Sequence, residues 1–130
     1  MLNEPTAEQL STLPPLLSTD GIACEDRIIQ LHFFVSKEDI CSALHIHAYG
    51  NSLQNSMPPC DHHWYVAEYD PETATCFGYF CFDGVHTGWG AWEYFGLEDL
   101  VFLEIGPARK RIVNDADWKP RKFSEIVNAI

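Results

Sequence analysis

The sequence is short of basic residues, with eight Lys and Arg against 19 Asp and Glu, and its formal net charge is −11. Residues 1–104 contain 16 acidic residues but only Arg27 and Lys37, a charge of −14, whereas residues 105–130 carry +3. Because acidic surfaces repel phosphates, the composition disfavours direct nucleic-acid binding except through the basic C-terminal stretch. It favours either simple solubility or attraction to a basic protein partner.

Long apolar runs are also absent. The most apolar stretches, such as Ile28-Ile29 and Phe33–Val35, are far too short to cross a bilayer. The opening Met1–Pro5 lacks the basic and apolar regions of a secretion signal. We therefore expect no membrane association and a cytoplasmic location.

Cysteine motifs are missing, although cysteine itself is not. The five cysteines cannot all pair within one chain, and none forms a Cys-x-x-Cys pair. Without a secretion signal, this pattern predicts reduced thiols, most of them small apolar core residues.

Sequence signatures of catalysis are lacking as well. The chain has no Gly-x-Ser-x-Gly elbow, and no glycine-rich loop is followed by Lys-Ser or Lys-Thr. The cluster at residues 109–111 fits a phosphate contact or, more simply, a solvated basic turn. The sequence thus predicts no catalytic residue and favours a non-enzyme.

The apolar content that is present suits one packed domain spanning residues 1–130. Hydrophobic residues make up 46% and aromatic residues 13% of the chain. Thr6 and Gln9 have the spacing of a capping box at the start of a short helix. Arg27–Val35 has the β-branched and aromatic content of a strand. Ser36 is a candidate N-cap for a helix over residues 37–48.

An aromatic meander follows. Trp64–Tyr69 alternates, which places Trp64, Val66 and Glu68 on one face of a strand. Asp70-Pro71 begins a turn, and the pattern predicts further strands over residues 76–82 and 88–95. A helical turn near residues 96–100 and a helix over 123–130 complete the chain. We predict an α+β fold, an antiparallel meander of about four strands with short helices packed on one face.

Several motifs occur together in a recognisable order: Leu13-Pro14-Pro15-Leu16, Ile28–Phe34, Trp64–Pro71, Phe77-Gly78-Tyr79, Trp92–Leu100, Asp117–Pro120 and Phe123–Ile126. In this order the chain resembles the domain-of-unknown-function 2958 family. The resemblance implies a compact bacterial α+β protein often carried on plasmids, phage-like or other mobile elements. It implies no catalytic residues, because none is established for the family. The chain departs from the pattern between residues 36 and 63, which resemble an inserted helix and loop.

The inserted region contains the best metal-ligand candidates. Cys41 and His45 are four residues apart and would share one face of a helix. Cys60 and His62, with His63 beside them, follow a loop that could return to complete a tetrahedral zinc site. Solvated or capping histidines would produce the same pattern. We therefore predict no cofactor, with zinc as the alternative.

Acidic and aromatic residues of the meander are the candidates for an interaction surface. Asp70 could serve its turn or, with Glu68, form a carboxylate pair; a buried Glu68 would need a partner such as Arg27. The full candidate set comprises Glu68, Asp70, Trp89, Trp92, Glu93, Glu98, Asp99 and Glu104.

Three hypotheses remain open from the sequence. The first is a non-catalytic interaction or inhibitory protein that binds a basic partner, as a nucleic-acid mimic directed at a defence or DNA-handling protein would. The second is a metal-dependent or small-molecule-binding enzyme that uses the aromatic sheet and the His- and Cys-containing insertion. The third is a homodimer that buries an apolar sheet face between its copies.

Overall fold

A five-stranded antiparallel sheet forms the centre of the computed structural model, which describes residues 4–39, 60–82, 90–105 and 110–127. Its strand order is β5-β4-β3-β2-β8, and every neighbouring pair is antiparallel. This arrangement confirms the predicted α+β class with an antiparallel meander. The strands are β2 (Leu31–Val35), β3 (His62–Asp70), β4 (Thr75–Phe82), β5 (Gly90–Gly96) and β8 (Val113–Asn114).

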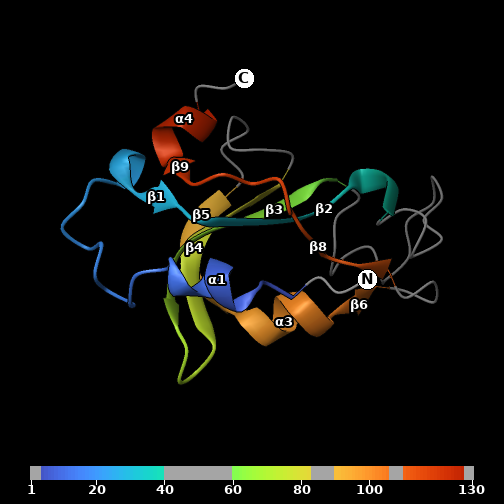
Figure 1. The fold of residues 1–130 in the computed structure, drawn as a ribbon. Helices are drawn as coiled ribbons and strands as arrows, with labels where there is room; N and C mark the ends of the chain where they lie inside the picture. Colours follow the sequence, from blue (N-terminus) through green and yellow to red (C-terminus); the bar gives the residue numbers. More distant parts are fainter. Residues whose placement is uncertain (1–3, 40–59, 83–89, 106–109, 128–130) are drawn as a thin grey trace.

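Short helices and two small strand pairs surround this sheet (Figure 1). The helices are α1 (Ala7–Ser11), the 3₁₀ helix η1 (Cys24–Asp26), α3 (Leu97–Phe102) and α4 (Phe123–Val127). The strand pairs join β1 (Ile28–Ile29) to β9 (Arg121–Lys122) and β6 (Glu104–Ile105) to β7 (Lys110–Arg111). Within the described residues, no helix is long and apolar enough to span a membrane.

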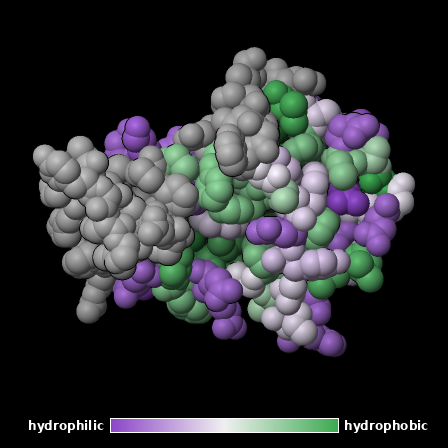
Figure 2. Space-filling view, turned by 180° about the vertical axis from the view of Figure 1, so that it is seen from behind, coloured by the Kyte–Doolittle hydropathy of each residue, from purple (hydrophilic) through white to green (hydrophobic). Residues whose placement is uncertain are grey.

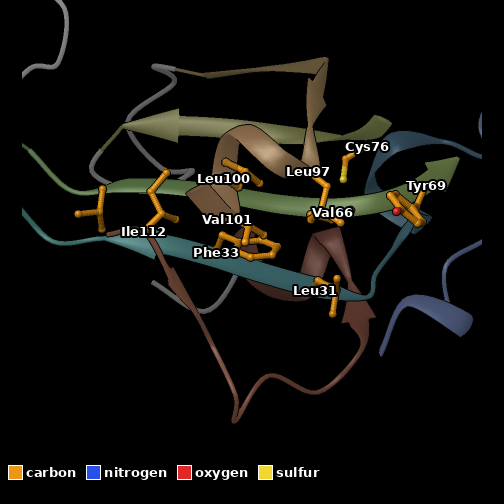
Figure 3. Close-up of a cluster of buried hydrophobic side chains, with 10 residues drawn as sticks. Leu31, Phe33, Val66, Tyr69, Cys76, Leu97, Leu100, Val101 and Ile112 are labelled. Carbon is orange, nitrogen blue, oxygen red and sulfur yellow. The ribbon is translucent and has the colours of Figure 1, made fainter. Parts of the chain in front are cut away.

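The face of the sheet toward α3 carries the larger hydrophobic core (Figure 3). Phe33 and Val66 from the sheet are fully buried, and Leu97, Leu100 and Val101 from α3 pack against the same cluster. In α3 the spacing of these three residues places their apolar side chains on one stripe. The polar remainder of α3, which includes Glu98, therefore faces outward.

The opposite face is covered by the C-terminal segment. Tyr65 and Cys81 from the sheet pack with Phe123 and Ile126 from α4. The indole N–H of Trp118 donates to the carbonyl oxygen of Ile29 at 3.0 Å, which fastens the segment before α4 to the sheet. Helices thus lie on both faces of the sheet, which corrects the prediction that short helices pack on one face. Most aromatic residues of the two faces are packed within the chain, although Tyr94 is 53% exposed.

A β-bulge in β3 changes which side chains share a face. The pairing with β4 shifts between Val66 and Glu68, so that Glu68 lies opposite Phe77 and Tyr69 opposite Cys76. The bulge inserts an extra residue and reverses the alternation beyond it. Glu68 therefore lies on the face of Tyr65, and the sequence-based assignment of Glu68 to the face of Val66 was wrong.

Two helix starts agree with the capping patterns of the sequence. The Thr6 hydroxyl accepts from the Gln9 N–H at 3.1 Å, and the Gln9 side chain accepts from the Thr6 N–H at 2.9 Å, confirming the capping box. Residues 37–39 are helical, and the Asp39 N–H donates to the Ser36 hydroxyl. The rest of the helix expected over residues 37–48, with most of the expected insertion, lies outside the described residues.

Candidate functional site

Two apolar grooves flank α1. The α1 groove, about 690 Å³ in volume, is lined mainly by Leu10, Leu13, Leu16, Tyr69 and Pro71. The α3 groove, about 180 Å³, lies between the N-terminal segment and α3 and is lined by residues that include Leu97 and Phe102. Leu10 and Tyr69 line both grooves. The two are called the paired grooves below.

Acidic residues border these grooves. Asp70 lines the α1 groove, while Glu4 and Glu98 line the α3 groove. Desolvation is the main cause that raises the pKa of Tyr69, and the negative charges of Asp70 and Glu98 act in the same direction. The shared wall at Tyr69 is therefore an apolar surface in a negative field, which suits a ligand with apolar and cationic groups.

Exposed apolar side chains extend this surface at the end of α3. Phe102 is 57% exposed and Leu103 is 42% exposed. On the face seen in Figure 2, apolar residues are interspersed with hydrophilic ones. Exposed aromatic and aliphatic residues beside a groove are typical of binding surfaces, whereas scattered ones need no special explanation.

The structure places the predicted interaction residues in several different settings. Asp70 and Glu98 are at the paired grooves, and Glu93 and Asp99 are exposed. Glu104 is exposed and lies 3.6 Å from the Arg111 guanidinium. Trp89 lies outside the described residues.

Two members of that set are held in the interior instead. Trp92 is half-buried, packs against Phe123, and has the Arg27 guanidinium 5.0 Å above its ring. Glu68 is only 1% exposed. Its carboxylate accepts hydrogen bonds from the Leu17 N–H at 2.8 Å and the Thr19 N–H at 2.9 Å, and from the Thr19 hydroxyl. Glu68 therefore anchors the loop after α1 and presents no surface to a partner, which corrects its assignment as an interaction residue.

The basic C-terminal residues are also used within the fold. Arg111 donates to the Val101 carbonyl oxygen at 3.0 Å, in addition to its contact with Glu104. Lys122 lies 3.8 Å from Asp26, and the Arg121 guanidinium lies 4.4 Å from the centre of the Trp118 ring. Three of the basic C-terminal residues thus contact groups of their own chain, whereas Arg109 of the predicted phosphate-contact cluster lies outside the described residues.

The metal-ligand candidates are only partly described. Cys60 Sγ and His62 Nε2 lie 3.9 Å apart, which brings together two of the four predicted ligands. Cys41 and His45 lie outside the described residues. Among the described residues, no group of three or more His, Cys, Asp or Glu side chains could hold a metal ion.

A chain of hydrogen-bonded side chains lies on the sheet face covered by the C-terminal segment. His32 Nδ1 lies 2.9 Å from Asp115 Oδ2, and His32 Nε2 lies 2.9 Å from His63 Nδ1. His32 is 8% exposed, whereas His63 and Asp115 are half-buried. We call Asp115, His32 and His63 the histidine relay.

Aromatic rings enclose the central histidine. The His32 ring stacks on Tyr65 at 4.7 Å and contacts Trp118 at 5.0 Å between ring centres. Burial lowers the pKa of His32, while the hydrogen bond and charge of Asp115 act in the opposite direction and the charge of Arg121 lowers it further. His32 is therefore neutral near pH 7.

Sequence reasoning missed most of this relay. It considered His63 only as a neighbour of a metal site and gave His32 and Asp115 no role. His32 and Asp115 are 83 positions apart, and their contact depends on the pairing of β8 with β2. The sequence did contain one indication, because His32 is a lone histidine in the otherwise apolar strand Leu31–Val35. A buried histidine needs a polar partner, but the sequence does not identify which residue that partner is.

The chain matches no family model, no curated protein and no solved structure. Its resemblance to the domain-of-unknown-function 2958 family therefore remains a prediction based on the order of its motifs.

Proposed function

We propose that this protein is a non-catalytic interaction module that binds a basic, amphipathic segment of a partner protein in the paired grooves. The observation that carries the proposal is the position of Tyr69. Its ring lines both apolar grooves, and Asp70 and Glu98 lie on their borders. Apolar side chains of the partner would fill the grooves, and its Lys or Arg residues would meet the acidic borders.

The charge distribution supports a basic partner over an acidic one. The net charge of −11 would attract cations from a distance and accelerate encounter. Arg111, Lys122 and Arg121 already contact groups of their own chain. The affinity would come mainly from burial of apolar side chains such as Phe102, because exposed ion pairs contribute little on their own.

The experiment is capture from nuclease-treated bacterial lysate by three immobilised forms of the protein. The first is the wild type. The second carries Glu4→Lys and Glu98→Lys at the α3 groove. The third carries Glu25→Lys and Asp117→Lys at exposed sites that do not line it. Both variants have the same net charge, so a difference between them reports position and not charge alone.

We expect a basic protein that the wild type and the Glu25/Asp117 variant retain, that the Glu4/Glu98 variant loses, and that high salt elutes. Crosslinks from that protein should map to the paired grooves. Equal retention by all three forms would contradict the groove assignment. If no protein is captured specifically, the acidity serves solubility and the proposal fails.

The partner class can be narrowed with the same complex. We propose a defence or DNA-handling protein, whose basic nucleic-acid site an acidic module would occupy. Duplex DNA should then compete with this protein for the captured partner. If the partner bound duplex DNA and this protein at the same time, this protein would not be a nucleic-acid mimic. The assignment of the paired grooves as the binding site would still stand.

A second candidate function is a zinc-dependent or small-molecule enzyme, and the contact between Cys60 and His62 favours it. Zinc would be measured by elemental analysis of protein purified without metal-affinity resin. Stoichiometric zinc that is lost on Cys60→Ser, with an exposed Cys24→Ser variant as the control, would support this class. Zinc-free protein with normal stability would oppose it.

A further inference from the structure

We propose that the outer edge of β5, the side away from β4, binds an extended basic segment of a partner protein as a further strand of the central sheet. Lys or Arg residues would alternate with apolar residues along that segment. None of the β5 residues lines either of the paired grooves. The β5 edge is therefore a second contact surface, and its occupation does not depend on the paired grooves.

Backbone groups along this edge have no hydrogen-bond partner among the described residues. In the strand order of the sheet, β5 is a terminal strand next to β4. The Leu97 N–H donates to the Ala74 carbonyl oxygen at 2.8 Å, and these two residues continue the β4–β5 register past the end of β5. In an antiparallel ladder, residues bonded to the neighbouring strand alternate with residues whose N–H and C=O groups point away. Counting back from Leu97, Trp92 and Tyr94 direct both backbone groups away from β4.

The β5 edge also lacks the features that usually prevent pairing with another chain. Natural edge strands are protected by short length, by Pro or Lys residues, or by bulges. At the opposite edge of the sheet, β8 has only two residues. In contrast, β5 has seven residues, contains no Pro or Lys, and pairs with β4 in one unbroken register. Its outer edge is therefore a continuous row of donors and acceptors that is long enough for another strand.

The side chains of β5 determine what an added strand would carry. Tyr94 is 53% exposed and lies 4.8 Å from Phe77 between ring centres, so it would contact an apolar side chain. Glu93 is exposed on the opposite face and would contact Lys or Arg. The Arg27 guanidinium lies over Phe77 and Trp92 and would repel a cation on the Tyr94 face. Successive residues of the added strand would therefore alternate between apolar and basic.

Charge favours a basic partner over a second copy of this chain. The carboxylate of Asp99 lies beside Gly96 and adds a second acid at the end of β5. Pairing of two β5 edges would bring the Glu93 residues of two copies together, each copy with a net charge of −11. Like charges across a strand pair are destabilising, and the two molecules would also repel each other at a distance. A basic segment replaces both repulsions with attraction.

The first test is amide hydrogen exchange of the free wild-type protein, measured residue by residue by NMR at several protein concentrations. The amides of Trp92 and Tyr94 should exchange at least about tenfold faster than those of Glu93 and Phe95, which are bonded to β4. Protection of the Tyr94 amide that grows with protein concentration would show that a second copy occupies the edge. Protection that is independent of concentration would show that the edge is paired within the chain. Either result would overturn the proposal.

The second test repeats the exchange measurement with a capped peptide as long as β5, in which Lys and Val alternate. Exchange of the Trp92 and Tyr94 amides should slow as peptide is added, by about twofold when the peptide concentration equals its Kd. A peptide of equal length in which Glu and Val alternate is the matched control and should have no effect. Absence of slowing with the Lys–Val peptide, or equal slowing with both peptides, would contradict the proposal.

A pair of variants separates the backbone contact from the side chain. Tyr94→Pro removes the outward N–H without breaking a bond to β4, whereas Tyr94→Thr removes the ring but keeps the N–H. The Lys–Val peptide, followed at the Trp92 amide, should bind Tyr94→Pro about fivefold more weakly than Tyr94→Thr, because one hydrogen bond is worth about 1 kcal/mol. Equal affinity would show that the β5 backbone is not the contact. The first two tests use the wild type, so they stay decisive if Tyr94→Pro does not fold.

Discussion

The carboxylate of Glu68 accepts hydrogen bonds from both the backbone N–H and the hydroxyl group of Thr19, 49 residues earlier in the chain. A third bond comes from the N–H of Leu17, whose backbone has a φ of 70°. One buried carboxylate thus accepts from three donors of a loop that also forms backbone hydrogen bonds within its own turns. The same loop forms part of the wall of the α1 groove through Pro15 and Leu16.

Glu68→Gln should lower the free energy of unfolding by about 1–3 kcal/mol, because an amide cannot accept all three hydrogen bonds and its NH₂ group would face donors. Urea unfolding followed by tryptophan fluorescence would measure the change. Glu72→Gln, an exposed acid in the nearby turn, is the control and should be neutral within about 0.5 kcal/mol. An equally small effect at Glu68 would mean that the loop is not anchored there.

Gly78→Ala should be strongly destabilising. A Cβ atom at Gly78 would lie 1.9 Å from the Tyr65 carbonyl oxygen, and the backbone of β3 would have to move. We expect a loss of about 3 kcal/mol or more, at or above the usual cost of overpacking. Gly21→Ala is the matched control, because nothing lies within 4 Å of its Cβ position. Comparable stability of the two variants in thermal unfolding would contradict the β3–β4 register.

Stability should fall as the solution is acidified below about pH 6.5, with His32 as one cause. Its pKa in the folded protein is lower than the ordinary 6.5, chiefly because of burial. Well above pH 6.5 His32 is neutral in both states and contributes no pH dependence. Below that value the unfolded chain takes up the proton first, which favours unfolding by up to about 1.4 kcal/mol per pH unit.

The contribution of His32 is tested by comparing the pH dependence of stability of the wild type with that of the His32→Phe variant. The variant retains every other titrating group. The variant should show a shallower loss of stability between pH 6.5 and the lower pKa of His32 in the folded protein. Parallel curves of stability against pH for the two proteins would show that His32 titrates alike in both states. Urea unfolding at a series of pH values would provide the curves.

Thiol labelling of the native protein should separate the cysteines by burial. Cys24 is exposed and should react at once with a maleimide or disulfide reagent. Cys76 is fully buried, and burial raises its pKa to about 12, so its thiolate is scarce at neutral pH. Mass spectrometry after brief labelling should find Cys24 modified and Cys76 unmodified. Full unfolding in denaturant, as the control, should expose both.

Local patterns were the most informative part of the sequence. The capping box at Thr6 and Gln9, the turn at Asp70-Pro71 and the strands on either side of it were all predictable from residues close together in the chain. Their interactions are short-range, so their energies depend little on the rest of the fold. The sequence predicted about four strands, whereas the central sheet has five. The missing strand is β8, Val113–Asn114, which is too short to show a periodic pattern.

The candidate site was predicted less well. Asp70 and Glu98, which the sequence named as interaction candidates, line the paired grooves, but nothing nearby in the sequence indicates that α1 packs beside Tyr69 to form them. The face of Glu68 was missed because a bulge leaves no distinct mark in an alternating aromatic strand. The histidine relay joins residues from distant segments, so no spacing rule could reveal it.

The sequence by itself determined the acidity of this protein, its α+β class and the start of its first helix. Composition and short-range spacing are sufficient for these properties. Only the tertiary structure decided that Glu68 is an interior anchor, that Lys122 lies beside Asp26, and that His32 links Asp115 to His63. The physical reason is that hydrogen bonds and burial depend on which strands pair, and pairing is a property of the whole chain.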